Sequence, residues 1–245
     1  MITCRPDLSF AVVKLTQFSA CPSEHYFNGL RHCLKYLRAT KSEGIHYWRT
    51  TPNTELEKGP THAVNSAPVD LLSEDRPNHP PSSFHGYADS DWATCPLTRR
   101  SFTGTCFLLA GAVVAYKTRL QPTPALSSTE AEFMAACDAG KICLFVRSVL
   151  HDLGVPQAAA SVLYEDNEGA IGMANAQKPT QRTRHMDIRY FALTDWVERD
   201  LLILDYIHNS KNLADNSTKP LSRIAFHRHV DYILGRVPPS HAPLT

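Results

Sequence analysis

The sequence lacks a strong excess of charge, a paired-cysteine pattern and any long apolar run. Its 245 residues have a formal net charge of +1, so attraction to nucleic acid would have to come from local patches. The seven cysteines form no C-x-x-C pair, which favours reduced thiols and no zinc site. The longest apolar run, Cys106 to Tyr116, is well below the ~18 residues that span a bilayer, and no signal-peptide pattern follows Met1. We therefore expect a soluble intracellular protein, cytoplasmic or nuclear, with no membrane partner.

The first 83 residues divide into a predicted helical pair and a Pro-rich segment. Asp7 is suited to cap a helix that runs to about Ser19, and Ser23 is suited to cap a second, amphipathic helix. The apolar positions that recur at helical spacing in the second helix are Tyr26, Phe27, Leu30, Cys33, Leu34 and Leu37. Residues 50–83 are rich in Pro, Ser, Thr and charge and show no sustained periodicity, so we interpret them as a linker.

From residue 84 onward the pattern indicates strands first and then strands alternating with helices. The predicted strands are 84–88, 102–109, 113–116, 162–165 and 201–207, and the predicted helices are 127–152, 168–175 and 190–199. The second and third strands read as a hairpin around Ala110-Gly111. This order indicates an α/β fold, with a mixed five-stranded sheet flanked by helices and preceded by the N-terminal helical pair.

Four carboxylates lie at the ends of predicted strands or helices: Asp89, Glu132, Asp166 and Asp215. Two divalent cations held ~3.5–4 Å apart carry four positive charges, and a cluster of hard anionic oxygens can hold such a pair. The ligands of such a site come from distant parts of a sequence and converge in the fold. The four acids are therefore a candidate two-metal site.

Two of these acids also have ordinary structural interpretations within their motifs. Asp89 ends an alternating run, and it or Asp91, which would share its face, could simply begin a turn. Two capping boxes compete near Glu132. If Thr129 caps the long helix, Glu132 completes the box, whereas if Ser127 is the cap, Glu132 is left free. Spacing alone leaves these alternatives open.

The other two acids are open to capping interpretations as well. Asp166 follows a strand and precedes a helix, where open α/β sheets place ligand groups but where Asp also commonly caps a helix. Asp215 would lie in the first turn of a short helix, where an acid also stabilises the helix dipole.

A basic loop between the predicted helices could contact phosphates or be an ordinary polar loop; its members are Lys178, Arg182, Arg184, His185 and Arg189.

Seven motifs occur in an order that resembles the C-terminal part of copia-type retrotransposon polyproteins. They are Arg5-Pro6-Asp7-Leu8, Gly86-Tyr87-Ala88-Asp89-Ser90-Asp91-Trp92-Ala93, Arg99-Arg100-Ser101, Ser127-Ser128-Thr129-Glu130-Ala131-Glu132, Glu165-Asp166-Asn167, Thr183-Arg184-His185-Met186-Asp187-Ile188-Arg189, and Leu213-Ala214-Asp215 with Thr218-Lys219-Pro220-Leu221. The resemblance covers nearly the whole chain. One such motif would be weak, but seven in the family's order make coincidence implausible.

The resemblance implies a ribonuclease H-like domain at 84–221, preceded by the end of the reverse transcriptase region and its connection at 1–49 and the linker at 50–83, and followed by a C-terminal helix and tail at 222–245. It implies that Asp89, Glu132, Asp166 and Asp215 are the catalytic acids, and it favours Asp89 over Asp91. The implied reaction is hydrolysis of the RNA strand of an RNA/DNA hybrid with two Mg²⁺ ions, or Mn²⁺. A reverse transcriptase domain supplied in trans would be a partner, and we expect a fragment of such a polyprotein.

Two other functions fit the same fold. An inactive remnant would keep the fold and bind nucleic acid or a partner without cleavage, although the intact acids argue against complete decay. An integrase-type nuclease normally uses three acids, so the fourth acid, Asp215, speaks against it. The sequence departs from the family pattern at Arg184-His185-Met186 and at Phe191, which affects the expected handling of substrate but leaves the acid set intact.

Overall fold

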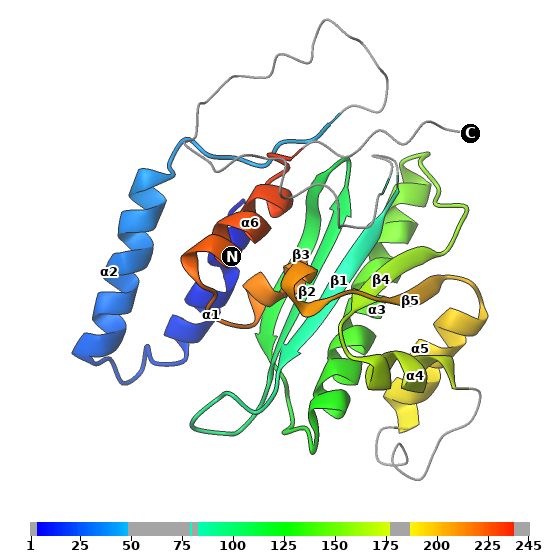
Figure 1. Ribbon diagram of the computed structural model, residues 1–245, viewed down its shortest axis with the longest axis horizontal. Helices are drawn as coiled ribbons and strands as arrows, with labels where there is room; N and C mark the ends of the chain where they lie inside the picture. The colour runs from blue at the N-terminus through cyan, green and yellow to red at the C-terminus, as the bar shows by residue number, and fades with distance from the viewer. Residues whose placement is uncertain (1–3, 49–78, 80–82, 177–186, 238–245) are drawn as a thin grey trace, which may run out of the picture.

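The computed structural model describes residues 4–48, 79, 83–176 and 187–237. Its centre is a five-stranded sheet in the order β3-β2-β1-β4-β5 (Figure 1). The strands are β1 (His85–Asp91), β2 (Phe102–Leu109), β3 (Ala112–Leu120), β4 (Ser161–Glu165) and β5 (Leu202–Tyr206). β1, β2 and β3 pair antiparallel, whereas β4 runs parallel to both β1 and β5. The expected mixed, ribonuclease H-like sheet is confirmed.

Helices cover both faces of this sheet (Figure 1). On one side lie α3 (Ser128–Asp152), α4 (Glu168–Asn175) and α5 (Asp187–Glu198). On the other side lie α1 (Ser9–Thr16), α2 (Glu24–Ala39) and α6 (Arg223–Ile233), together with the 3₁₀ helix η5 (Leu213–Ser217). Among the described residues, no helix is both long enough and apolar enough to cross a membrane.

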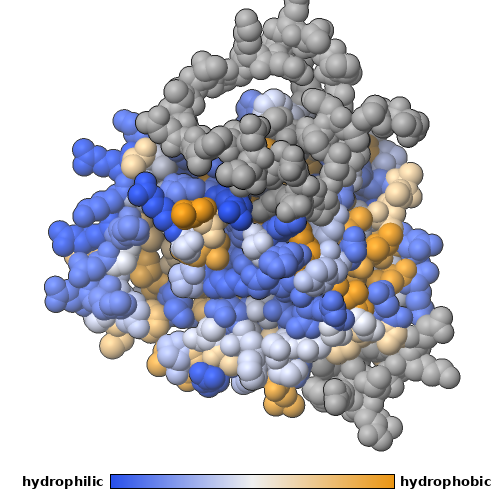
Figure 2. All heavy atoms as spheres, in the orientation of Figure 1, coloured by the Kyte–Doolittle hydropathy of each residue, from blue (hydrophilic) through white to orange (hydrophobic). Residues whose placement is uncertain are grey.

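Alternation along the central strands explains why two separate apolar cores form. Ala88 and Phe107 belong to the core beneath α3, whereas Tyr87 and Leu108 belong to the core beneath η5 and α6. Because successive side chains of a strand point to opposite faces, a strand covered on both sides needs an almost continuous apolar run. Residues 106–109, the second half of β2, meet this requirement. The face visible in Figure 2 is accordingly mainly hydrophilic, with apolar residues in smaller patches.

Small residues let α3 lie close to its neighbours. Ala131, Ala135 and Ala139 are fully buried. A Cβ atom added at Gly140 would lie 2.6 Å from Cζ3 of Trp196 on α5, so only glycine fits there without a shift. Gly140 thus lets α3 and α5 pack closely against each other.

The N-terminal helices form as expected, but Asp7 does not cap the first one. Asp7 lies in a 3₁₀ turn, η1 (Pro6–Leu8), α1 begins at Ser9 and ends at Thr16 rather than near Ser19, and no side chain caps it. The carboxylate of Asp7 instead accepts hydrogen bonds from Arg5 and from the hydroxyl of Tyr36 on α2. A distant hydroxyl and a neighbouring guanidinium thus outcompete the local capping bond.

The amphipathic helix α2 carries its predicted apolar residues, but no described residue of this helix is buried. Phe27 and Leu34 are more than half exposed. Ser23 stands at the predicted N-cap position without a side-chain capping bond. The helix contacts α1, and Tyr26 stacks on Phe18, which follows the end of α1, with ring centroids 3.7 Å apart.

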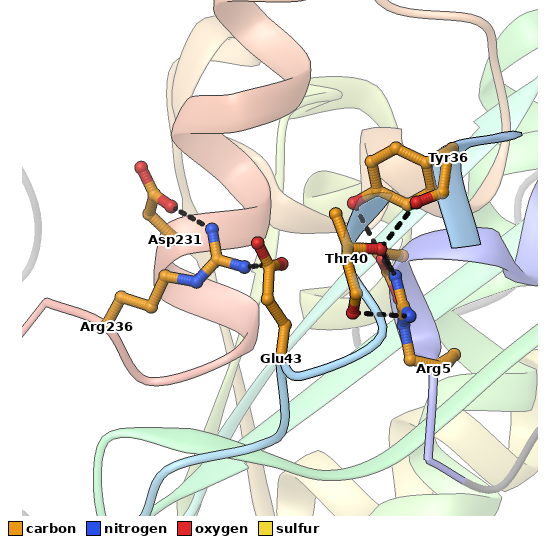
Figure 3. A network of polar contacts seen from close by, with 7 residues as sticks. Arg5, Tyr36, Thr40, Glu43, Asp231 and Arg236 are labelled. Atoms are coloured by element: carbon orange, nitrogen blue, oxygen red, sulfur yellow. Dashed lines mark hydrogen bonds and ion pairs between the residues drawn. The ribbon is translucent and has the colours of Figure 1, made fainter. Parts of the chain in front are cut away.

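The segment after α2 joins the N-terminal helices to α6. Arg236 forms ion pairs with Glu43 and with Asp231, the latter at 2.8 Å (Figure 3). The indole N–H of Trp48 donates to the carbonyl oxygen of Gly235 at 2.9 Å. Gly235 has a φ of 70°, and a Cβ there would lie 1.9 Å from the carbonyl oxygen of His46, so this junction requires glycine.

Candidate active site

The sheet topology brings the ends of two distant strands together. β1 and β4 are parallel neighbours, and Tyr87 pairs with Tyr164. Asp89 and Asp166 each follow that pair by two residues, so they lie side by side near the C-terminal ends of the two strands. η5 packs against β1 and places Asp215 at the same edge. Carboxylate oxygens of Asp89, Asp166 and Asp215 lie within 4.8 Å of one another.

A second group of carboxylates overlaps the first. Oxygens of Glu132 on α3, Glu165 at the end of β4 and Asp166 also lie within 4.8 Å of one another. Asp166 therefore belongs to both groups. The structure thus brings together all four acids singled out in the sequence and adds Glu165, which we had not predicted as a site residue. The sequence feature that could have identified Glu165 is an acid at the last, inward-facing position of a buried strand.

The competition between capping boxes on α3 is decided by hydrogen bonds. Ser127 accepts from the backbone N–H of Glu130 at 3.1 Å, and the Glu130 carboxylate accepts from the backbone N–H of Leu126 at 2.8 Å. Glu130 therefore acts with Ser127 at the helix start. This leaves Glu132 free of a capping role, and it is buried against the sheet.

Neighbouring asparagines cap the two helices beside Asp166 and Asp215, and Asp215 lies in the first turn of η5 as predicted. The side-chain oxygen of Asn167 accepts from the N–H of Ala170 at 3.0 Å and caps α4. Asn212 caps η5 in the same way, accepting from Ala214 at 3.1 Å, and donates to the carbonyl oxygen of Ala88 on β1 at 2.7 Å. The second bond ties η5 to the strand that carries Asp89.

Two residues of the Thr218-Lys219-Pro220 motif contact the first group of acids. The ammonium of Lys219 lies 2.7 Å from Oδ1 of Asp215 and 3.7 Å from Oδ1 of Asp89. Thr218 donates a hydrogen bond to the other carboxylate oxygen of Asp89. Asp91, at the end of β1, belongs to neither carboxylate group. Lys219 was not among the predicted site residues, although its spacing of four from Asp215 was a usable signal.

Burial and mutual repulsion give the acids a high proton affinity in the absence of metal. Desolvation, together with the charges of Asp89 and Asp166, raises the pKa of Glu132 to about 10. Desolvation and the charge of Asp89 raise the pKa of Asp215 to about 8. Burial likewise raises the pKa of Glu165 well above its ordinary value. Burial disfavours the charge of Lys219, but Asp89 and Asp215 outweigh this and raise its pKa.

The donor set fits hard divalent cations. Every clustered ligand atom is a carboxylate oxygen, the type that Mg²⁺ and Mn²⁺ prefer. In the described part of the chain, Oε2 of Glu132 and both carboxylate oxygens of Glu165 have no hydrogen-bond partner, although these oxygens are buried. Buried polar atoms are ordinarily paired, so oxygens left without a partner are available to a cation.

The predicted nucleic-acid contacts are not placed by the structure. Lys178, Arg182, Arg184 and His185 lie outside the described residues. Arg189 lies on α5, but its side chain is not described. Their contact with phosphates stays a prediction.

Comparisons with known proteins were made by sequence and by structure. No protein-family model matches the chain. It is 30% identical over 237 residues to the Pol polyprotein of transposon RE1 from Arabidopsis thaliana, which covers 96% of this chain and 14% of that polyprotein. It is 28% identical over 226 residues to the Pol polyprotein of transposon TNT 1-94 from Nicotiana tabacum, covering 92% and 15%. LC11-RNase H1 from compost aligns with 61% of this chain and 99% of its own length, at 14% identity and a TM-score of 0.44.

The chain has a ribonuclease H-like fold, with acids clustered near the C-terminal ends of β1 and β4. The chain belongs to the retrovirus-related Pol polyproteins of copia-type retrotransposons. It spans only about one seventh of the length of the relatives it matches, which are 14 to 15% covered.

Proposed function

We propose that this chain is a ribonuclease H that hydrolyses the RNA strand of RNA/DNA hybrids. The observation that carries the proposal is the convergence of Asp89, Asp166 and Asp215 within 4.8 Å at one sheet edge, with Glu132 adjoining through Asp166. Four converging acids from separate parts of the chain, of which Glu132 and Asp166 have no capping role, are difficult to explain by stability. Clustered buried carboxylates repel each other and lower stability unless a cation joins them.

The proposed catalytic acids are Asp89, Glu132, Asp166 and Asp215, and they would hold two Mg²⁺ or Mn²⁺ ions. Bound there, divalent cations would supply an activated water and charge stabilisation for in-line attack on a phosphodiester. The protein's own part is positional. Asn212 fixes η5 to β1, Thr218 orients the carboxylate of Asp89, and α3 places Glu132 against the sheet.

Recognition of the hybrid would depend on its shape and on the 2′-hydroxyl groups of the RNA strand. An RNA-containing duplex displays these hydroxyls in a wide, shallow minor groove, and a DNA duplex has none. Lys178, Arg182, Arg184, His185 and Arg189 would add salt-dependent affinity for phosphates. A reverse transcriptase domain supplied in trans would extend this contact along the hybrid.

The division of the chain is part of the proposal. Residues 84–221 would form the nuclease unit, 1–49 the end of the polymerase region, 50–83 the linker and 222–245 a C-terminal helix and tail. The contacts of Glu43 and Trp48 with Arg236 and Gly235 support a role for the N-terminal helices in holding α6 against the sheet.

The test is cleavage of a labelled RNA/DNA hybrid by the purified chain with Mg²⁺ or Mn²⁺. RNA duplex and DNA duplex are included as alternative substrates. We expect cleavage of the hybrid's RNA strand alone, lost in Asp89→Asn and kept in Asp205→Asn, which removes an exposed acid on β5. A folded chain that binds hybrid but does not cleave it under either metal would indicate an inactive remnant. Undiminished cleavage by Asp89→Asn would refute the assignment.

A further inference from the structure

Glu165 occupies a position where a strand normally carries an apolar residue. It is the last residue of β4, and it points to the same face as Leu163, two residues earlier. Leu163 is fully buried in the core beneath α3, and Glu165 also has no exposed surface. Glutamate is almost never fully buried unless it is paired. A purely structural role does not account for an acid at this position.

Glu165 has no ion-pair partner in the described part of the chain, and the nearby backbone N–H of Asn167 offsets its burial only in small part. Both of its carboxylate oxygens lack a hydrogen-bond partner, and so does Oε2 of the adjacent Glu132. The ion pairs of Lys219 are with Asp215 and Asp89, which belong to the other carboxylate group. Glu132, Glu165 and Asp166 therefore present converging, buried oxygens with no cation of the protein's own between them.

We propose that Glu165 is a further metal ligand, which with Glu132 and Asp166 forms a divalent-cation position beside the one formed by Asp89, Asp166 and Asp215. The inference rests on the proposed function, because the two positions together make up its metal centre. Asp166 is shared by both. Three carboxylates at this position increase its negative charge, and the charge and number of oxygen ligands set the affinity for a hard cation.

Mn²⁺ binding to the intact chain, measured by calorimetry with a Mn²⁺ titration of thermal stability, tests the proposal. The variants are Glu165→Gln, which keeps one neutral oxygen, and Glu165→Met, which has none at similar length. We expect Mn²⁺ affinity to decrease from the wild type to Gln and further to Met, by about tenfold or more in the Met variant. Without metal, the Met variant should melt above the wild type, because it removes a buried unpaired polar group, whereas the Gln variant keeps one and should melt near the wild type. A variant that melts no lower than the wild type is folded, so a loss of Mn²⁺ binding in it cannot be attributed to misfolding.

Two comparisons decide the result. Glu132→Gln should weaken the same Mn²⁺ binding step as Glu165→Gln, whereas Asp205→Asn should leave both steps unchanged. Unchanged Mn²⁺ affinity in both Glu165 variants, while Glu132→Gln lowers it, would overturn the proposal. A wild type that binds Mn²⁺ in a Glu165-dependent manner but cleaves no hybrid would support the proposal and refute the proposed function instead.

Discussion

Two buried charge clusters in this molecule differ in how their carboxylates are satisfied. At the N-terminus, Asp7 accepts two hydrogen bonds from Arg5, at 3.0 and 2.7 Å, and one from the hydroxyl of Tyr36 at 2.8 Å. Arg5 also donates to the side chain and the carbonyl oxygen of Thr40 (Figure 3). One acid, one base and two hydroxyls balance each other. A cluster of this kind holds two helices together and needs nothing from outside.

The carboxylates where β1 and β4 end are arranged in the opposite way. Asp89, Glu132, Glu165, Asp166 and Asp215 come from four different elements, and Lys219 is the cation that pairs with two of them. Three of the buried oxygens, Oε2 of Glu132 and both of Glu165, have neither a hydrogen-bond partner nor an ion pair in the described part of the chain. The comparison teaches that burial of charge does not by itself mark a functional site. In this molecule the candidate functional site is marked by an excess of buried acidic groups that the protein itself does not pair.

Asp166→Asn should have the largest effect, because Asp166 belongs to both carboxylate groups. Loss of an outer-shell partner of a metal already costs 10–100-fold in activity, so loss of a shared ligand should reduce hybrid cleavage by about 100-fold or more. Hybrid cleavage and Mn²⁺ titration measure this. Asp91→Asn, a nearby acid outside both groups, is the control and should keep most of the activity. Equal losses in the two variants would refute the distinction between them.

Asp7→Ala should break the balanced cluster and affect stability rather than chemistry. It leaves the guanidinium of Arg5, whose side chain is only 12% exposed, without its partner. Removing one member of a buried pair should lower the free energy of unfolding by about 3 kcal/mol. Chemical denaturation measures the loss. Cleavage per folded molecule should not change, and a selective loss of turnover would contradict the structural role.

The stability of the carboxylate cluster near the ends of β1 and β4 should depend on pH. In the folded state the pKa of Asp215 is raised from 3.8 to about 8, so its protonated form favours folding. That stability is complete below pH ~4, near the pKa of an unfolded carboxyl, and is lost as the pH rises through about 8. In a chelator, the melting temperature should fall by about 5 °C, roughly 2 kcal/mol, between pH 6 and 9. Excess Mg²⁺ should remove the decrease, and a decrease that persists in Mg²⁺ would count against a metal site.

Lys219→Met should have the smallest effect on stability. The substitution removes the cation that pairs with Asp215 and Asp89, and the metal-free chain should lose about 1 kcal/mol. The concentration of Mg²⁺ needed for half-maximal stabilisation should fall, because the ammonium no longer competes for these oxygens. Lys219→Arg, which keeps the charge, is the matched control. A weaker response to Mg²⁺ in the Met variant would show that Lys219 assists metal binding instead.

Much of the fold was predictable because local patterns carried it. Strand alternation placed all five strands, and β2 was predicted at its observed bounds, Phe102–Leu109. The third strand is longer than predicted, extending to Leu120, because pairing with β2 continues along polar residues that have little strand signal. The capping role of Asp7 was wrong, since Tyr36 lies 29 residues away in sequence and no local rule includes it.

The site was predictable only in part. Motif resemblance indicated Asp89, Glu132, Asp166 and Asp215, while spacing left each of them open to a structural role in a turn, a helix cap or a helix dipole. Hydrogen bonds of Ser127 and Asn167 removed the capping alternatives for Glu132 and Asp166, and they depend on backbone geometry that the sequence does not specify. Glu165 was missed because only the packing of α3 on β4 reveals that its carboxylate meets Glu132.

By itself, the sequence determined the order of strands and helices, the family, and the acids that resemblance selects, because periodicity and motifs are properties of neighbouring residues. The tertiary structure alone decided which acids converge and which charges are balanced. Parallel pairing of β1 with β4 and the docking of η5 and α3 join residues from positions 89 to 219. Convergence of this kind depends on long-range packing, in which each contact is fixed by many others at once.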